Sequence, residues 1–252
     1  MPAHSEPLRL GVVCEAAADH ELATHLADRL LKERLPWLSD VALDDVRRWH
    51  GLLPAEPFLL WRDVPKLVRE RQLRLTGKFG AESGAMDARS ARGALLLFAS
   101  QAASVRPHAV LLLRDTDGHE DRCKGLQQAR TDPDRHWPFP IVIGAEHCKR
   151  ESWILAGFEP TSKEESERLA DQRELLGFHP CERPELLAAS DDAASSKRSA
   201  KKVLAALTDE DRRRESACYQ DVPLELLRKR GTHCGLANFL AYVEKRLVPL
   251  LR

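Results

Sequence analysis

Carboxylate side chains follow the predicted buried strands of this sequence, at the point where each strand ends. Glu15 ends the first strand, Asp115 and Asp117 end the second, and Glu151 follows the third by one short turn. Because neighbouring parallel strands lie about 5 Å apart, side chains at their carboxyl ends can reach one small cation. Oxygen ligands without paired His or Cys favour Mg²⁺ or Mn²⁺ over zinc. The sequence therefore predicts a divalent-metal site at this sheet edge.

The elements that must position these carboxylates alternate between strand and helix. Continuous apolar runs predict strands over 8–15, over 139–145 and in the run AVLLLRDTDG that starts at Ala109. Helical patterns are predicted over 19–35, 87–103 and 118–130. Such alternation predicts an α/β fold with a mainly parallel sheet flanked by helices, whose ligand site lies beyond the carboxyl ends of the strands.

The chain is predicted to divide near residue 158. Residues 1–158 form the core, with a helical excursion at about 36–80, and 159–252 form a mostly helical extension that packs on the core. A chain of 252 residues, 43% of them hydrophobic, is long enough to bury such a core.

The overall composition limits the classes of partner. Lys plus Arg and Asp plus Glu are equal at 39 each, so attraction to nucleic acid must come from local patches and bound metal. The six Cys include no CxxC pair, which favours a reducing compartment and inert buried thiols. No secretory signal and no apolar stretch approaching 18 residues is present, so we expect a cytoplasmic protein without a membrane partner.

Three segments resemble the TOPRIM fold of topoisomerases, primases and overcoming-lysogenization-defect (OLD) nucleases, which places a Glu after the first strand and a DxD after a later one. They are CEAAADHE, LLLRDTDG and IGAEHCKRESWILA. The spacing of Glu15 and Asp19 is similar to the ExxxD of the OLD-like branch, and Glu151 with Trp153 resembles the Glu-x-Trp of small bacterial TOPRIM-like proteins. The resemblance covers roughly 8–158, with a weaker echo in the Lys201 helix and the closing helix. Ala16 stands where these families usually carry Gly.

The resemblance implies metal-dependent hydrolysis or nicking of phosphodiester bonds. Glu15, Asp115 and Asp117 would hold cations that orient water and neutralise the scissile phosphate, with Glu15 alternatively the general acid or base. Lys149 or Lys201 would stabilise the developing charge, and Asp19 and Glu151 would complete a second metal site. The implied setting is bacterial antiviral defence, with DNA ahead of RNA as substrate and an ATPase encoded nearby as partner. Oligomeric state is left open.

Other interpretations of the same residues stay open. Ala16 and the lack of one evident catalytic Lys favour a non-catalytic TOPRIM-like interaction or sensor subunit. The DTDG motif is also similar to that of haloacid-dehalogenase phosphatases, with Asp115 as nucleophile, although those enzymes place it after the first core strand. Asp19 could simply cap a helix, and Glu151 could be a first-turn acid that suits the helix dipole.

The basic clusters of the sequence are interpreted mainly as solvated faces. Those at 66–78, 212–214 and 228–230 are interleaved with acids. The cluster at 197–202 adjoins the echo of the family pattern and is the one expected to contact nucleic acid.

Overall fold

The computed structural model describes residues 6–53, 55–147, 149–189 and 196–252. The chain forms two compact units. Unit 1 comprises residues up to Arg114 together with 120–144 and 241–252, and unit 2 comprises 115–119 and 145–240. This division runs through strands and does not follow the predicted boundary near residue 158, which stays a prediction.

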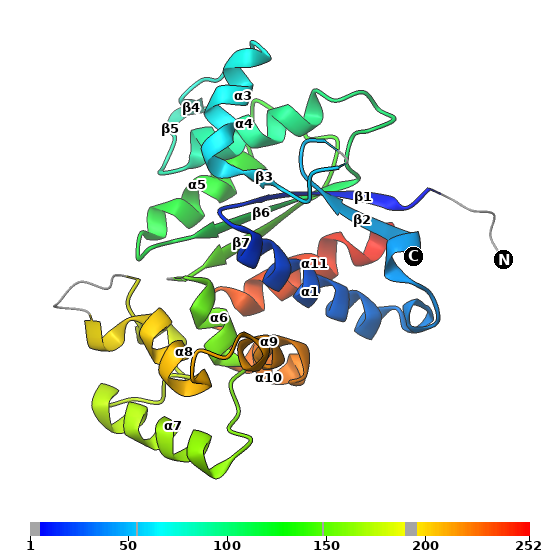
Figure 1. The fold of residues 1–252 in the computed structure, drawn as a ribbon. Helices are drawn as coiled ribbons and strands as arrows, with labels where there is room; N and C mark the ends of the chain where they lie inside the picture. Colours follow the sequence, from blue (N-terminus) through cyan, green and yellow to red (C-terminus); the bar gives the residue numbers. More distant parts are fainter. Residues whose placement is uncertain (1–5, 54, 148, 190–195) are drawn as a thin grey trace. The chain divides into compact units, whose positions relative to one another are not determined.

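A parallel sheet forms the centre of the α/β region (Figure 1). Its strands are β1 (Leu8–Cys14), β2 (Arg47–His50), β3 (Leu59–Leu60), β6 (Ala109–Asp115) and β7 (Ile141–Glu146). Their order is β2-β1-β6-β7, and β3 pairs with β1 beyond the end of β2. The register of β1 and β6 runs from Leu10 opposite Ala109 to Val13 opposite Leu112. The predicted α/β class with a mainly parallel sheet is confirmed.

Helices of unit 1 flank this sheet, with α4 and α5 on one face and α1 on the other (Figure 1). The helical and hairpin elements are α1 (Ala17–Arg34), η1 (Pro36–Asp40), α2 (Leu43–Val46), η2 (Trp61–Asp63), α3 (Val64–Glu70), β4 (Lys78–Phe79), β5 (Glu82–Ser83), α4 (Ala88–Ala99), α5 (Glu120–Arg130) and η5 (Val248–Leu250). Residues 77–84 contain the short β4–β5 hairpin.

Unit 2 is mostly helical, as predicted for the C-terminal region. It contains α6 (Arg150–Ala156), α7 (Lys163–Leu176), η3 (Pro184–Leu186), η4 (Ser196–Arg198), α8 (Ala200–Thr208), α9 (Arg212–Gln220), α10 (Leu224–Arg230) and the first part of α11 (Leu236–Arg246). In the described part of the chain, no helix is both long and apolar enough to cross a membrane.

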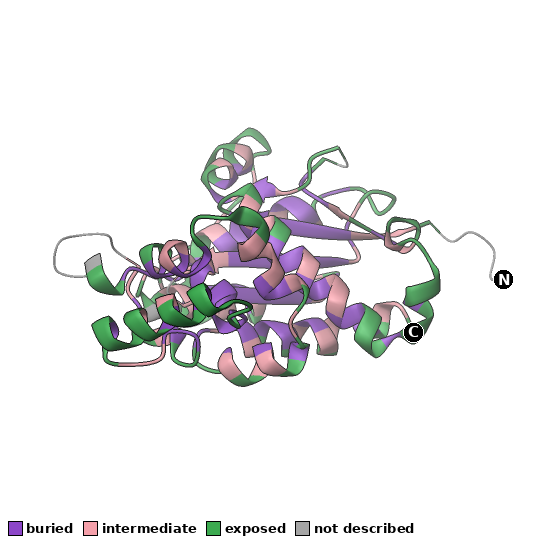
Figure 2. Cartoon of the chain, turned by 60° about the horizontal axis from the view of Figure 1, so that its bottom comes forward, coloured by how far each residue is buried: buried purple, intermediate pink, exposed green. Residues whose placement is uncertain are grey.

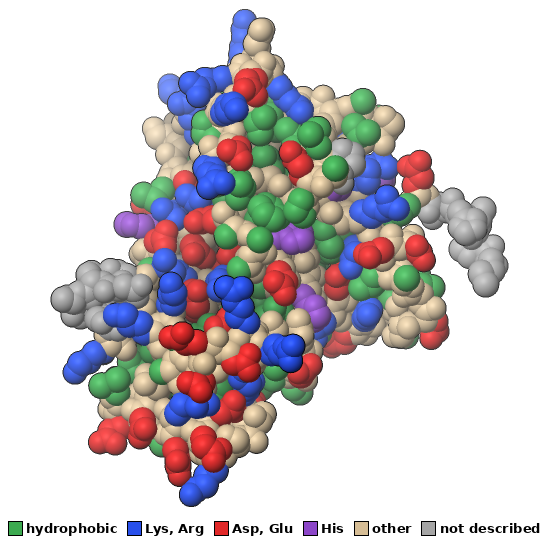
Figure 3. Space-filling model, in the orientation of Figure 1, with side chains coloured by type: hydrophobic (Ala, Val, Ile, Leu, Met, Phe, Trp, Pro, Cys, Tyr) green, Lys and Arg blue, Asp and Glu red, His purple; other side chains and the backbone are tan. Residues whose placement is uncertain are grey.

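The central strands are the most deeply buried elements of unit 1. Val12, Val13 and Leu111 have no exposed surface. Figure 2 shows these buried strands, with exposed residues on the outer sides of the helices. Charged side chains of both signs cover much of the face shown in Figure 3.

Strand β2 is one of the elements that the apolar pattern misses, because its sequence RRWH is polar. The side chain of Arg47 is nonetheless buried, and its Nε donates to Asp28 Oδ1 at 2.8 Å. Trp49 Nε1 donates to the same oxygen at 3.2 Å. Burial raises the pKa of Asp28, and the hydrogen bonds from Arg47 and Trp49 oppose that effect. Specific pairing with α1, rather than strand hydrophobicity, therefore holds β2 in place.

A buried ion pair anchors the hairpin region of unit 1. Arg92 and Asp132 have side chains 1% and 0% exposed, and Arg92 Nε lies 2.6 Å from Asp132 Oδ2. Arg92 Nη1 donates to the Thr76 carbonyl at 3.0 Å, and the guanidinium lies 3.6 Å from the ring centroid of Phe79. One buried cation thus connects α4, the segment after α5 and the strand β4.

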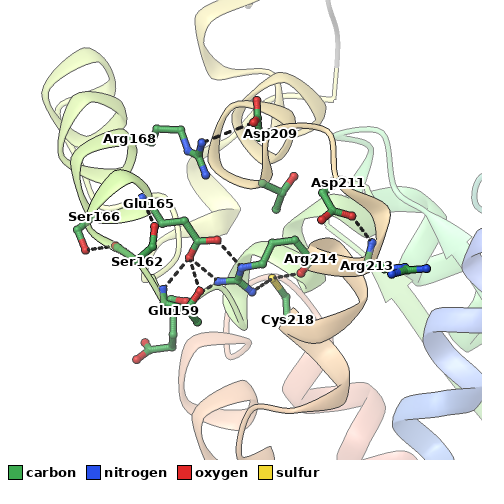
Figure 4. Close-up of polar contacts among 12 residues, drawn as sticks. Glu159, Ser162, Glu165, Ser166, Arg168, Asp209, Asp211, Arg213, Arg214 and Cys218 are labelled. Atoms are coloured by element: carbon green, nitrogen blue, oxygen red, sulfur yellow. Dashed lines mark hydrogen bonds and ion pairs between the residues drawn. The ribbon is translucent and has the colours of Figure 1, made fainter.

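A second charged cluster organises unit 2 (Figure 4). Arg214 on α9 donates through Nε to Glu165 Oε1 at 2.6 Å and through Nη2 to Oε2 at 3.0 Å. The guanidinium lies 4.7 Å from the ring centroid of Phe158. Glu165 also accepts from the Thr161 backbone N–H at 2.6 Å. The Arg214 hydrogen bond, with help from Thr161, lowers the pKa of Glu165 to about 2.

Three of the described cysteines have thiols that are expected to be unreactive. Burial raises the pKa of Cys181, Cys218 and Cys234 to about 12. These cysteines are free, and their protonated state agrees with the inert, buried role expected from the sequence.

Removing the negative charge from the buried pair in unit 1 is expected to destabilise the fold. In Asp132→Asn the Arg92 charge stays buried without its counter-ion, so the free energy of unfolding should fall by about 3–5 kcal/mol. Denaturant unfolding measures this change, with the exposed Asp40→Asn as matched control, expected to change it by less than about 0.5 kcal/mol. Equal effects of the two substitutions would contradict the role of the pair.

The depressed pKa of Glu165 predicts acid sensitivity of unit 2. Its ionised form is stabilised by folding, so this contribution is fully present above the ordinary pKa of 4.5 and is lost as pH falls through about 2. The free energy of unfolding of Glu165→Gln should therefore fall less over that pH range than that of wild type. The control is Glu167→Gln, an exposed residue of the same helix, which should follow the wild-type profile.

Candidate functional site

The turn after β6 carries the predicted DxD pair. Asp115 is the last residue of β6, and the His119 backbone N–H donates to the Thr116 carbonyl at 2.7 Å. Asp117 and Gly118 lie between them with φ of 48° and 77°. Asp and Gly are residue types that tolerate two successive left-handed positions, so the turn by itself favours this dipeptide. Asp117 therefore has a structural role, whether or not it binds a cation.

The N-terminus of α6 holds two further predicted residues. Lys149 precedes the helix, and its Nζ lies 3.8 Å from Asp117 Oδ1. Glu151 is buried in the first turn, with Oε1 3.6 Å from Arg150 Nε. An acid in the first turn also suits the dipole of the helix. Within unit 2, Asp117 is thus paired with Lys149, and Glu151 is paired with Arg150.

Unit 2 contains more polar groups at the ends of β6 and β7 than the sequence suggested. The Thr116 backbone N–H donates to the Glu146 carbonyl at 2.9 Å, and Thr116 Oγ1 lies 3.4 Å from His147 Nδ1. Glu146 is 1% exposed. Its position in the sequence could have identified Glu146 as a candidate, because it ends β7 just as Asp115 ends β6. Glu146 and His147 join the candidate residues.

Trp153, the last residue of the Glu-x-Trp motif, is part of the core of unit 2. Its Nε1 donates to the Cys234 carbonyl at 2.8 Å, and its ring centroid lies 5.0 Å from that of Phe239. Gly235 follows with φ of 88°, and a Cβ atom there would lie 2.1 Å from the Ala145 carbonyl oxygen. The tryptophan therefore anchors α6 to the segment that leads into α11.

Glu15 lies in unit 1, directly after β1, where an arginine compensates its charge. Arg114 Nη1 is 3.0 Å from Glu15 Oε1, and Arg114 Nε is 2.9 Å from Asp87 Oδ2. The guanidinium also lies 5.6 Å from the ring centroid of Trp61, whose Nε1 donates to the Leu113 carbonyl at 2.6 Å. One arginine thus connects the first strand, the start of α4 and β6.

The two other predicted residues occupy ordinary helix positions. Asp19 Oδ2 accepts from the Ala16 backbone N–H at 2.9 Å, so the side chain caps the first turn of α1. Lys201 is exposed in the first turn of α8.

No protein-family model, no curated protein and no solved structure matches this chain. The functional assignment therefore depends on the residues themselves. Among the described residues of either unit, no three His, Cys, Asp or Glu side chains are gathered closely enough to hold a metal ion. The side-chain geometry brings Asp117 to Lys149 in unit 2 and Glu15 to Arg114 in unit 1. The joint use of Glu15 and Asp19 with the unit 2 residues stays a prediction.

The central position of Arg114 in unit 1 gives a stability prediction. Arg114→Gln removes two ion pairs and the contact with Trp61, so the free energy of unfolding should fall by about 1–3 kcal/mol. Arg114→Lys keeps the charge but not the forked geometry, so its free energy of unfolding should lie between those of wild type and Arg114→Gln. Thermal and denaturant unfolding measure the change, with the exposed Arg135→Gln as control. A loss no larger than that of the control would contradict this role.

Proposed function

We propose that this chain is a divalent-metal-dependent nuclease that hydrolyses or nicks phosphodiester bonds. The observation that supports this most is the turn after β6, where a carboxylate ends the strand and Asp117 lies 3.8 Å from the amine of Lys149. Carboxylates that bind a cation beside a lysine are groups that can catalyse phosphodiester hydrolysis. The resemblance to the TOPRIM family supports the same chemistry.

Asp115 and Asp117 are the residues proposed to hold Mg²⁺ or Mn²⁺, and Glu151 keeps the second-site role implied by the resemblance. Carboxylate oxygens are the donors that these hard cations prefer, so the donor type fits. A bound cation there would supply charge neutralisation and an activated water. Lys149 would stabilise negative charge that develops on the phosphate, and Glu146 is an additional carboxylate in the same unit. Glu15, Asp19 and Lys201 keep the roles implied by the resemblance as predictions.

The proposed biological setting also comes from the resemblance. It is bacterial antiviral defence, with DNA as the first substrate to test and RNA as the second. An ATPase encoded nearby is the proposed partner.

A second function, that of a non-catalytic interaction or sensor subunit, is favoured by a specific observation. The carboxylates most strongly predicted to act already contact cationic side chains, Glu15 with Arg114 and Asp117 with Lys149. Such ion pairs reduce the negative charge available to a metal ion. A subunit that keeps the fold but does not cut would show this pattern.

Cleavage of supercoiled plasmid with Mg²⁺ or Mn²⁺ tests the nuclease. Asp115→Asn and Asp117→Asn should each lower the rate by about a hundredfold or more, because they remove ligand charge. Asn also tolerates the left-handed backbone of position 117, so the second substitution changes charge with little strain. The control is Asp171→Asn, an exposed residue of α7.

The outcomes separate the candidate functions. Metal-dependent cutting that persists in both asparagine variants would show that the catalytic site lies elsewhere. If plasmid, single-stranded DNA and RNA all stay intact with either metal, even with the ATPase present, the non-catalytic function is favoured. Turnover of a small phosphate ester with an aspartyl-phosphate trapped on Asp115 would instead indicate a phosphatase.

A further inference from the structure

A surface in unit 1 carries a local excess of positive charge. The segment 62–78 contains six Lys and Arg against two Asp and Glu, within a chain whose formal net charge is zero. All six cationic side chains are exposed, as is Arg89 in the first turn of α4. We call these seven residues the α3 surface: Arg62, Lys66, Arg69, Arg71, Arg74, Lys78 and Arg89. Figure 3 shows Lys and Arg side chains gathered over the region of α3, around an apolar area.

Two hollows flank α3 within this surface. One, of about 500 Å³, has Arg69 from α3 and Arg89 with Ser90 from α4 in its lining. Its apolar lining includes Val64, Val68 and Leu75. The other, of about 580 Å³, has Lys66 and Arg71 in its lining, together with the carboxylates Glu56 and Asp63. A chain of phosphates that crosses α3 would therefore meet cations on both sides of the helix.

Ion pairing does not account for most of this charge. Lys66 lies 3.8 Å from Glu70 Oε1, and Arg71 Nη1 donates to the Leu97 carbonyl at 3.5 Å. Within the described ranges, no carboxylate lies within 4.0 Å of a guanidinium nitrogen of Arg69, Arg74 or Arg89. Of the acids interleaved with these cations in the sequence, Glu70 pairs with Lys66, whereas Arg69, Arg74 and Arg89 have no carboxylate partner among the described residues.

We infer that the α3 surface binds the phosphodiester backbone of a polynucleotide. Arginine forks match phosphate oxygens in geometry, and exposed cations gain affinity by releasing counter-ions from the nucleic acid. An anionic membrane fits less well, because Val64 and Val68, the two valines of the short α3, are 1% and 5% exposed and are not available to insert. The inference rests on the proposed function and names where its substrate would be held.

Binding without catalysis is the direct test. Fluorescence anisotropy in EDTA, over a series of salt concentrations, measures affinity for a labelled DNA duplex and a labelled single strand. Arg69→Gln combined with Arg89→Gln should weaken binding by about tenfold or more and reduce the slope of log affinity against log salt by about two. Lysine at both positions should retain most of the affinity.

The matched control removes two arginines from another exposed cluster, as Arg212→Gln with Arg213→Gln. Acidic neighbours surround that pair, so we expect near wild-type binding. Thermal unfolding of both double variants should match wild type, because all four side chains are exposed.

Three results would overturn the inference: no binding of either DNA by wild type, equal losses in the two double variants, or arginine-dependent binding of phosphatidylglycerol vesicles but not of DNA. DNA binding that depends on Arg69 and Arg89, in a chain that cuts no substrate, would support the α3 surface while the nuclease proposal fails. Cutting by the wild-type chain, together with unchanged DNA affinity in the variant with Arg69→Gln and Arg89→Gln, would support the nuclease proposal while the inference about the α3 surface fails.

Discussion

The parallel pairing of β1 with β6 is the constraint on which the α/β region depends. Both strands are buried, so their backbone N–H and C=O groups must pair with neighbouring strands. The register that places Val13 opposite Leu112 also brings Arg114 to the level of Glu15, and this arginine then links the first strand to α4. Once the register is set, the charged groups at the end of β1 have little freedom.

Each unit also contains a charged pair that holds peripheral segments. Arg92 with Asp132 does this in unit 1, and Arg214 with Glu165 does it in unit 2. Misplacing one partner of an ion pair with so little exposure is costly, because it leaves a buried charge without compensation. Helices of modest intrinsic hydrophobicity, such as α7 and α9, can therefore adopt defined positions within unit 2.

Several motif residues have local structural reasons to be present. Asp117 suits a left-handed turn, Asp19 caps α1, and Trp153 packs in the core of unit 2. Local folding requirements therefore account for the residue types at these positions. Functional evidence must come from substitutions that preserve shape while changing charge, since changes of shape would disturb the fold as well.

The sequence alone determined the alternation of strand and helix. It also determined that Asp115, Asp117 and Glu151 follow the ends of strands, because apolar runs and periodicity are local properties. It could not reveal β2, whose polar residues are fixed by Asp28 in α1, nor the burial of Glu146. It also favoured a solvated face for the cations of 66–78, which are interleaved with acids. Only the tertiary structure decided which charges meet, as it paired Glu15 with Arg114 and left Arg69 and Arg89 beside a hollow. The reason is that electrostatic partners are chosen by distance in space, which sequence spacing does not report.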